Sequence, residues 1–156
     1  MKAREFLSRL GLTLNVEKTH VVSVWKGFEF LGMTFRYRKT SPHAKKLKYA
    51  CYRWPRKKAV AALKDKIRQK IGRRYSLSLD EVIKEINPII AGWHRYFRVG
   101  NGELHFRRLD RFIQNRLRIF VKRKHSNPNR GLRKLVGGLL ERLGLYRLAR
   151  GRVSIV

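Results

Sequence analysis

The segment 79–97 constrains the fold most, because it joins a marked helix start to a broad apolar stripe. Ser78 and Glu81 have the spacing of a capping box, in which a hydroxyl and a carboxylate each satisfy a backbone amide of the first turn. Pro88 lacks an amide donor and predicts either a kink near Asn87 or a break into two helical pieces. Apolar residues recur at steps of three and four, which predicts one buried face: Val82, Ile83, Ile86, Ile89, Ile90, Trp93, Tyr96 and Phe97.

Two more segments have helical periodicity. Pro55 is suited to a first helical residue, and apolar residues then repeat at helical spacing up to Gly72. A third stripe extends from Phe106 to Val121. Three such helices can bury their apolar faces in one core. After residue 126, a short apolar pattern predicts one more helix and a strand.

The N-terminal part has a different pattern. Residues 1–11 predict a short helix that ends at Gly11. Segments 12–16 and 21–25 are rich in β-branched and large apolar residues, which predicts strands. The aromatic residues that follow predict a hairpin in which Gly32 is either a β-bulge or a point of close backbone approach. The fold class is therefore predicted as α+β, mainly α, with a small N-terminal β element before the helices.

Charge indicates the kind of partner. The 156 residues include 39 lysines and arginines and 10 acids, a formal net charge of +29. This excess is greater than solubility requires and predicts a polyanionic partner. A membrane is the weakest candidate, because no apolar run approaches the roughly 18 residues of a spanning helix. The N-terminus has no secretory pattern, so we expect a cytoplasmic protein.

An extended run at 49–54 mixes rings with cations. Tyr49, Tyr52 and Trp54 lie among lysines and arginines, and this mixture lets rings stack on bases while cations hold phosphates. A strand packed on its neighbours would have the same composition, so both interpretations stay open.

The residues needed for catalysis or metal binding are scattered. Two-metal nucleases and polymerases need several acids close together, but only Asp80 and Glu81 are adjacent, and a helix start explains that pair. The five histidines have no metal-ligand spacing with one another or with Cys51, the single cysteine. The sequence therefore predicts a binding protein with no metal site and no cofactor of its own, and catalysis by this chain alone is not expected.

Several blocks resemble a known family. FLSRLGLTLNVEKTHVV at 6–22 and FEFLGMTFR at 28–36 resemble the last two blocks of the reverse-transcriptase palm. INPIIAGWHRYFR at 86–98, FRRLDRFI at 106–113 and RLRIFVKRKH at 116–125 resemble the maturase-specific thumb, or X domain, of group II intron-encoded proteins. The resemblance implies three parts: 1–54 as the end of the palm, 55–125 as the thumb and 126–156 as a basic tail.

The resemblance also implies roles for residues. Phe30, Leu31 and Gly32 correspond to a primer-grip remnant, and Trp93, Tyr96 and Phe97 to the thumb core. No catalytic residue is expected, because the Tyr-Ala-Asp-Asp block of the polymerases does not occur in these 156 residues. Cations expected to contact RNA, from charge and resemblance together, are Lys45, Lys46, Lys48, Arg53, Arg56, Lys57, Lys64, Arg68, Arg73, Arg74, Arg95, Arg98, Arg107, Arg108, Arg111 and Arg118.

Three functions fit these observations. The first is a maturase fragment that binds and stabilises group II intron RNA for splicing. The second is the thumb portion of a reverse transcriptase that holds an RNA–DNA template–primer with a palm subunit supplied in trans. The third is a generic basic RNA chaperone. Mg²⁺ is expected only with the intron RNA or with a complete palm.

Overall fold

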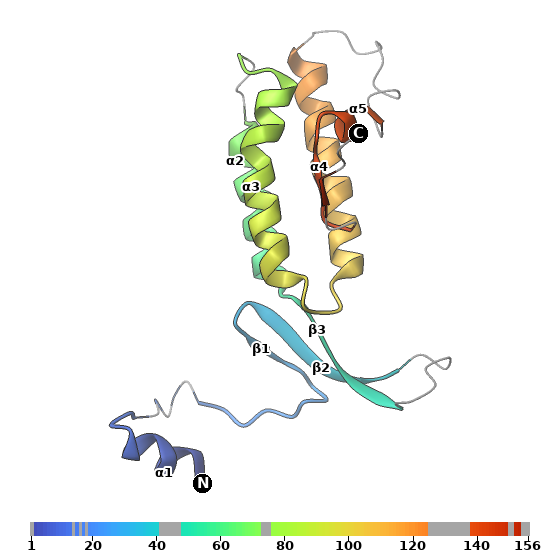
Figure 1. Ribbon diagram of the computed structural model, residues 1–156. Helices are drawn as coiled ribbons and strands as arrows, with labels where there is room; N and C mark the ends of the chain where they lie inside the picture. Colours follow the sequence, from blue (N-terminus) through green and yellow to red (C-terminus); the bar gives the residue numbers. More distant parts are fainter. Residues whose placement is uncertain are drawn as a thin grey trace.

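The computed structural model describes residues 2–13, 15, 17, 19–40, 48–72, 76–124, 138–149 and 152–153 of the chain. Three long helices stand side by side above a small antiparallel sheet, and a short N-terminal helix lies beyond the sheet (Figure 1). This arrangement confirms the predicted α+β, mainly helical class. The elements in order are α1 (Lys2–Arg9), β1 (Phe28–Phe30), β2 (Met33–Lys39), β3 (Tyr49–Pro55), α2 (Lys57–Ile71), α3 (Leu79–Phe97), α4 (Glu103–Lys124), α5 (Gly138–Arg142), β4 (Tyr146–Arg147) and β5 (Arg152–Val153).

Helix α3 begins as its sequence predicts. The Ser78 hydroxyl accepts from the Glu81 amide at 3.2 Å, and the Glu81 carboxylate accepts from the Ser78 amide at 2.6 Å. The pKa of Glu81 lies below its usual value, because the Ser78 backbone amide, and then the Ser78 side chain, favour the ionised carboxylate by hydrogen bonding. The predicted capping box is confirmed.

Pro88 does not interrupt α3, which is continuous from Leu79 to Phe97. The ring is exposed, and the carbonyl left without its amide partner belongs to Lys84, an exposed residue one turn earlier. Water can solvate that carbonyl, so the missing hydrogen bond costs little. The alternative of a break into two pieces was wrong, and a kink near Asn87 stays a prediction.

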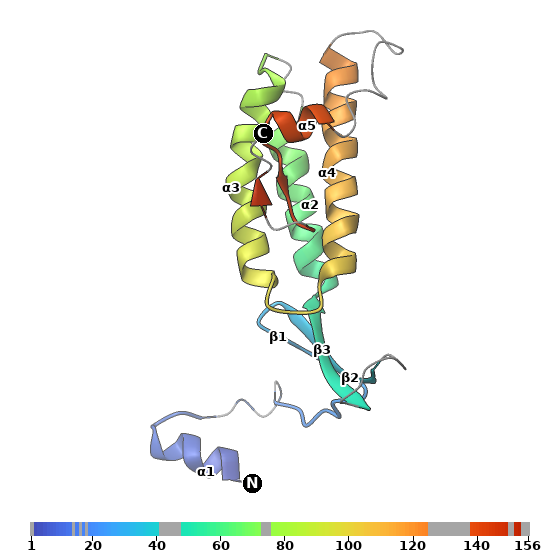
Figure 2. The same cartoon turned by 45° about the vertical axis from the view of Figure 1, so that its right-hand side comes forward.

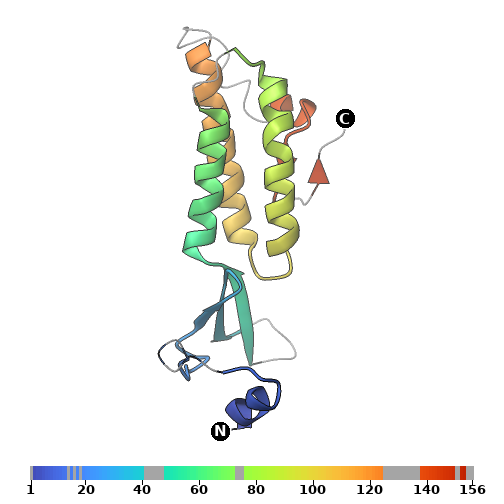
Figure 3. The same ribbon diagram turned by 90° about the vertical axis from the view of Figure 1, so that its left-hand side faces the viewer.

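The core lies between α2, α3 and α4. Ile67, Ile86 and Ile90 are fully buried, and Leu117 of α4 is fully buried beside them. Figure 3 shows α2 and α3 side by side with α4 behind them. Helix α2 ends at Gly72, whose amide donates to the Arg68 carbonyl at 2.8 Å. The three predicted stripes therefore close one core, as expected.

The start of α2 differs from the prediction. Pro55 is the last residue of β3, is buried, and faces Met33 of β2 across the sheet. Arg56 follows in an extended conformation as the N-cap. Proline suits the end of a strand as well as a first helical turn, since neither position needs its missing donor. The pairing of Pro55 with Met33 of β2 selects the position at the end of the strand.

The hairpin between β1 and β2 is confirmed, but Gly32 is not a bulge. Leu31 and Gly32 form a two-residue turn in which both φ angles are positive, 46° and 76°. Positive φ at both central positions is typical of a type I′ turn, which matches the twist of the flanking strands. Glycine adopts this conformation freely, whereas Leu31 is strained in it.

The sheet is attached to the helices at the α3–α4 turn. The Asn101 amide donates to the Arg53 carbonyl at 2.6 Å, and the Asn101 side chain accepts from the Arg53 amide at 3.3 Å. Gly100 lies so close that a Cβ there would be 2.5 Å from the Arg53 carbonyl oxygen. Only glycine fits at this contact, which places the sheet directly under the bundle.

The C-terminal segment packs on the bundle. Figures 1 and 2 show α5 and the β4–β5 ribbon over α3 and α4, on the side away from α2. Leu140, Leu145 and Leu148 are buried there. The predicted further helix is present, and the predicted strand is a two-stranded ribbon.

Two predicted N-terminal strands were wrong. The described residues of 12–16 form no strand, and 21–25 is irregular up to a turn at Val24–Lys26. Segment 24–27 instead runs beside β2, where the Tyr37 amide donates to the Val24 carbonyl at 2.9 Å. Helix α1 is present, and Gly11 ends it with φ 69°.

Candidate nucleic-acid interface

The predicted cations do not lie on one surface. The sheet carries Lys48 and Arg53, and the lower end of α3 carries Arg95 and Arg98. Lys45, Lys46, Arg73 and Arg74 lie outside the described residues. The largest group lies on α2 and α4: Arg56, Lys57, Lys64, Arg68, Arg107, Arg108, Arg111 and Arg118.

Helices α2 and α4 form a cationic seam, which we define by Lys64, Arg68, Arg108, Arg111 and Phe112. The Lys64 ammonium and the Arg68 guanidinium lie 5.3 and 5.2 Å from the centre of the Phe112 ring. Arg108 is one turn before Phe112, and both Arg108 and Arg111 are exposed. The ring holds two cations in place by cation–π attraction. The seam can therefore present fixed positive charges to a phosphate backbone.

Some cations have acidic partners that the sequence did not suggest. Arg56 pairs with Glu29 of β1, and Lys70 pairs with Glu85 of α3, each at 3.5 Å. These two carboxylates come from other elements, whereas Arg68 pairs with Asp65 of α2 itself. Such exposed pairs contribute little and can exchange for phosphate contacts.

Two other cations of α4 have partners within the protein. Arg107 pairs with Glu103 at 3.0 Å. The Lys124 ammonium donates to the Leu77 carbonyl at 2.6 Å and ties the end of α4 to the start of α3. Arg107 remains mostly exposed, whereas Lys124 has a structural role.

The residues that resemble a primer grip meet the bundle at the hairpin turn. The Tyr96 hydroxyl donates to the Leu31 carbonyl at 2.8 Å, and the Arg56 amide donates to the Gly32 carbonyl at 3.0 Å. Phe30 and Leu31 are 59% and 68% exposed, so their side chains are available to a partner. The turn is thus fixed to α3 through its backbone.

The expected aromatic core is partly correct. Phe97 is buried, and Trp93 is half-buried with its ring centre 4.4 Å from that of Phe97. Tyr96 is 53% exposed and was wrongly placed in the core. Tyr96 lies in the last turn of α3, next to the sheet. Its hydroxyl therefore bonds to the hairpin turn instead.

The rings of the sheet are involved in packing. Trp25 makes edge contacts with Tyr37 and Tyr49, at ring distances of 4.8 and 5.3 Å. The Arg38 guanidinium lies 5.1 Å from the centre of the Trp54 ring. These contacts support the interpretation of 49–54 as a packed strand.

A polar clasp, missed in the sequence, holds the C-terminal segment. The Asn87 amide group donates to the Gly144 carbonyl at 2.8 Å and accepts from the Tyr146 amide at 2.9 Å. The Asp110 carboxylate, 4% exposed, accepts from the amides of Leu148 and Ala149 at 2.9 and 3.0 Å. The sequence contained a signal for both residues, because each is a polar residue within or next to the apolar stripe of its helix.

His94 completes the clasp. It is 7% exposed, and its Nδ1 lies 2.8 Å from the Tyr146 hydroxyl. Burial, and then the nearby Arg98 charge, lower the pKa of His94, while Asp110 and Glu103 oppose them. His94 therefore lies in the core of the bundle.

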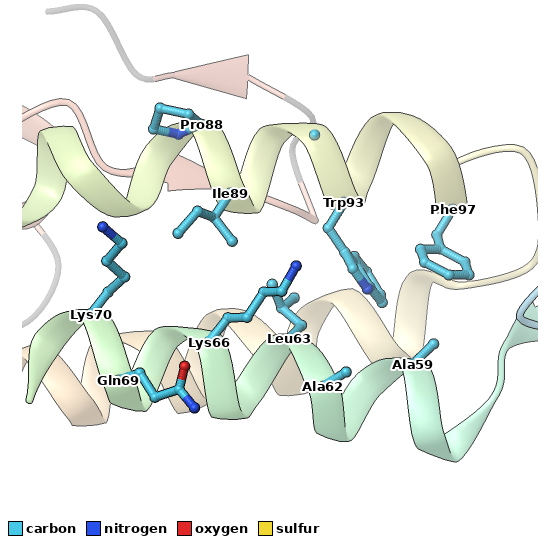
Figure 4. Close-up of a pocket in the computed structure, with 11 residues that line it drawn as sticks. Ala59, Ala62, Leu63, Lys66, Gln69, Lys70, Pro88, Ile89, Trp93 and Phe97 are labelled. Atoms are coloured by element: carbon cyan, nitrogen blue, oxygen red, sulfur yellow. The ribbon is translucent and has the colours of Figure 1, made fainter.

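A groove of about 940 Å³ runs between α2 and α3. Ala59, Ala62 and Gly92 give it small-residue walls, and the Trp93 ring points into it from α3 (Figure 4). Lys66 and Lys70 extend from α2 toward α3 along its length (Figure 4). None of the described residues that line it is acidic.

Metal sites and membrane spans do not occur among the described residues. These residues contain no group of three or more His, Cys, Asp or Glu side chains that could hold a metal ion. No helix in the described ranges is long and apolar enough to cross a bilayer.

The helical bundle matches a known family. Residues 60–136 match the model of the group II intron, maturase-specific domain. This part of the chain belongs to that family. The match begins in α2 and includes all of α3 and α4, the helices that carry the seam and the groove. No curated protein matches the chain.

The maturase-specific domain relates the chain to the group II intron maturases and confirms the resemblance of its helical part. Residues 1–54, which resemble the palm, lie before the matched segment. The roles of Phe30, Leu31 and Gly32 therefore stay predictions.

Proposed function

We propose that this chain binds group II intron RNA through the maturase-specific domain and stabilises the folded RNA for splicing. The cationic seam carries the proposal, since it sets Lys64, Arg68, Arg108 and Arg111 on two helices of that domain. Arginine suits this task because its planar group can bind phosphate with two hydrogen bonds. Mg²⁺ would enter such a complex with the folded RNA, whose phosphate oxygens are its preferred kind of ligand.

Binding to intron RNA can be separated from general attraction to phosphate. Affinity for a group II intron RNA and for an unrelated structured RNA of equal length should be measured across a salt series. Phosphate contact alone is blind to sequence and weakens steeply with salt. A preference for the intron that persists at high salt is expected. Equal affinities at every salt concentration would indicate a generic basic chaperone.

The seam itself can be tested by removing its arginines. Arg108→Ala with Arg111→Ala should lower the slope of log affinity against log salt by about one for each phosphate that is no longer neutralised. Arg142→Ala is a matched control, because it removes an exposed arginine from α5 on the opposite side of the bundle. An effect of Arg142→Ala that is half that of the double variant, and thus the same for each charge removed, would show that overall charge, and not the seam, governs binding.

A second candidate function has support from the N-terminal part. Phe6, Leu10 and Trp25 are 64%, 60% and 51% exposed, which leaves apolar surface beside the sheet. A reverse-transcriptase palm packed on this surface would join the thumb to a polymerase, and the exposed hairpin turn would then lie near an RNA–DNA template–primer. Mixing the chain with a separately made palm and measuring primer extension tests this function. No gain over the palm alone would count against it.

A further inference from the structure

We propose that the groove between α2 and α3 binds an unpaired RNA base, with the Trp93 ring as its stacking surface. This inference rests on the proposed RNA-binding function and adds a specific site to it. The base would insert between the two helices. Lys66 would hold the phosphate on one side of it, and Lys70 would exchange its exposed pair with Glu85 for the phosphate on the other side.

The shape of the groove fits an inserted planar group. Its volume of about 940 Å³ lies within the range of roughly 300–1,000 Å³ that is typical of ligand pockets. A Cβ built on Gly92 meets nothing within 4 Å, and Gly92 is exposed, so the groove is open to solvent at this point of α3. Ala62 on α2 faces this space and is itself exposed. Small residues on both walls leave room for a ring.

The chemistry of the groove fits a nucleotide. Trp93 is fixed by contacts with Phe97 and Phe106, whose ring centres lie 4.4 and 6.1 Å away. A fixed ring loses little conformational entropy when a base stacks on it, and stacking on aromatic side chains accepts any base. Gln69 adds an amide that can bond a base edge. The lining thus combines an aromatic surface, amide donors and cations.

The position of the groove connects it to the seam. Lys64 and Arg68 lie on the α4 side of α2, whereas Ala62 and Lys66 lie on its α3 side. An α-helix is about 10 Å wide with its side chains. An RNA strand held at the seam can therefore cross α2 and deliver an unpaired base to the groove. This continuity, with the cationic rim, favours RNA over an acidic helix of a partner protein.

Two RNA probes test the groove. The first is a hairpin with one bulged adenosine, and the second is the same hairpin with an abasic nucleotide at the bulge. The ratio of their dissociation constants isolates the base, because both probes have the same phosphates. Stacking on one aromatic side chain corresponds to a preference of about 5- to 150-fold. The wild-type chain is expected to prefer the adenosine hairpin by about tenfold.

Matched variants test whether the preference for adenosine arises in the groove. Gly92→Leu and Ala62→Leu each put a bulky side chain into the open space and should bring the ratio close to one. Gly92→Ala leaves the groove open and should keep the ratio, with better helix propensity. Ala61→Leu makes the same change one residue earlier, about 100° around α2, where the residue does not line the groove, and should also keep it. The thermal unfolding of each variant shows whether the bundle is intact.

Each outcome has a distinct meaning. A ratio of one in the wild type, with salt-dependent binding to both hairpins, overturns the base site and leaves the RNA-binding function intact. A wild-type ratio that survives Gly92→Leu also overturns it. Binding to neither hairpin overturns the RNA-binding function as well. Binding of an acidic amphipathic peptide that Ala62→Leu abolishes, without any preference for adenosine, assigns the groove to a protein.

Discussion

The helical bundle and the N-terminal 31 residues contain similar apolar side chains but bury them to different degrees. Ile83 and Ile86 of α3 are fully buried, whereas Phe6 of α1 is 64% exposed and Val21 is fully exposed. The bundle has three long stripes that cover one another. The N-terminal segments are too short to do so, and α1 lies beyond the sheet, away from the bundle (Figure 1). The bundle closes its own core, while the N-terminal part leaves its apolar groups exposed.

The same contrast separates the two proposed binding surfaces. The cations of the bundle are placed by a rigid core, and the Phe112 ring fixes two of them. The rings near the hairpin turn, such as Phe30, are placed by a short strand at the foot of the bundle. RNA recognition by the bundle should therefore persist when the N-terminal part is altered, whereas any palm contact should not.

The largest difference should come from matched truncations in the two regions. Ile86→Ala should lower the free energy of unfolding by about 4 kcal/mol, because it leaves a cavity in the core. Phe6→Ala should change it by less than about 0.5 kcal/mol. Urea unfolding of both variants at one salt concentration checks this. A large loss of unfolding free energy from Phe6→Ala would show that α1 is packed in solution and would contradict the difference between the two regions.

A somewhat smaller effect should follow removal of the polar clasp. Asp110→Ala leaves the amides of Leu148 and Ala149 without their acceptor and removes one of the two carboxylates that pair with Arg147, and should cost about 3 kcal/mol. Glu103→Ala on the same helix removes only an exposed ion pair and should cost less than about 1 kcal/mol. Urea unfolding compares the two variants. Similar losses would mean that the C-terminal segment adds no stability to the bundle.

The pH dependence of unfolding tests the buried histidine. Burial lowers the pKa of His94 in the folded state, so the unfolded chain takes up the proton first as pH falls. Stability is complete above the ordinary pKa of about 6.5 and is lost as pH falls from there through the folded pKa, by at most about 1.4 kcal/mol per pH unit. His94→Gln should flatten the profile between about pH 5 and 7.

His105 should act in the same direction, since burial and then Arg108 lower its pKa. His105→Gln is therefore the second arm of the pH experiment, and the double variant should have the flattest profile. A slope between about pH 5 and 7 that survives in the double variant would assign the acid sensitivity in that range to groups other than His94 and His105.

The smallest effect should come from the hairpin turn. Leu31→Asn should stabilise the chain by about 0.5–1 kcal/mol, because Asn-Gly suits a type I′ turn far better than Leu-Gly. Thermal unfolding measures this gain. Affinity for a template–primer measured on the same variant tests the primer-grip role. A gain in stability with unchanged affinity would show that the Leu31 side chain has no part in binding.

The elements that sequence predicts best are those whose signals are local. The bounds of α3 follow from Ser78, Glu81 and an apolar repeat, and Gly72 ends α2 as expected. Capping and periodicity act within one or two turns of a helix, so neighbours in sequence are enough to specify them. The net positive charge can likewise be predicted from the sequence, because it depends on composition alone. This charge indicates a polyanionic partner.

Tertiary structure decided every feature whose partner is distant in sequence. Pro55 joined the strand because Met33 lies opposite it, and Tyr96 left the core because Leu31 lies beneath α3. Asp110 has a structural role because its carboxylate accepts hydrogen bonds from amides 38 and 39 residues away. The groove, too, exists only where α2 and α3 meet. The sequence by itself determined the helices, their caps and the charge, while long-range contacts decided which side chains are buried, paired or left exposed.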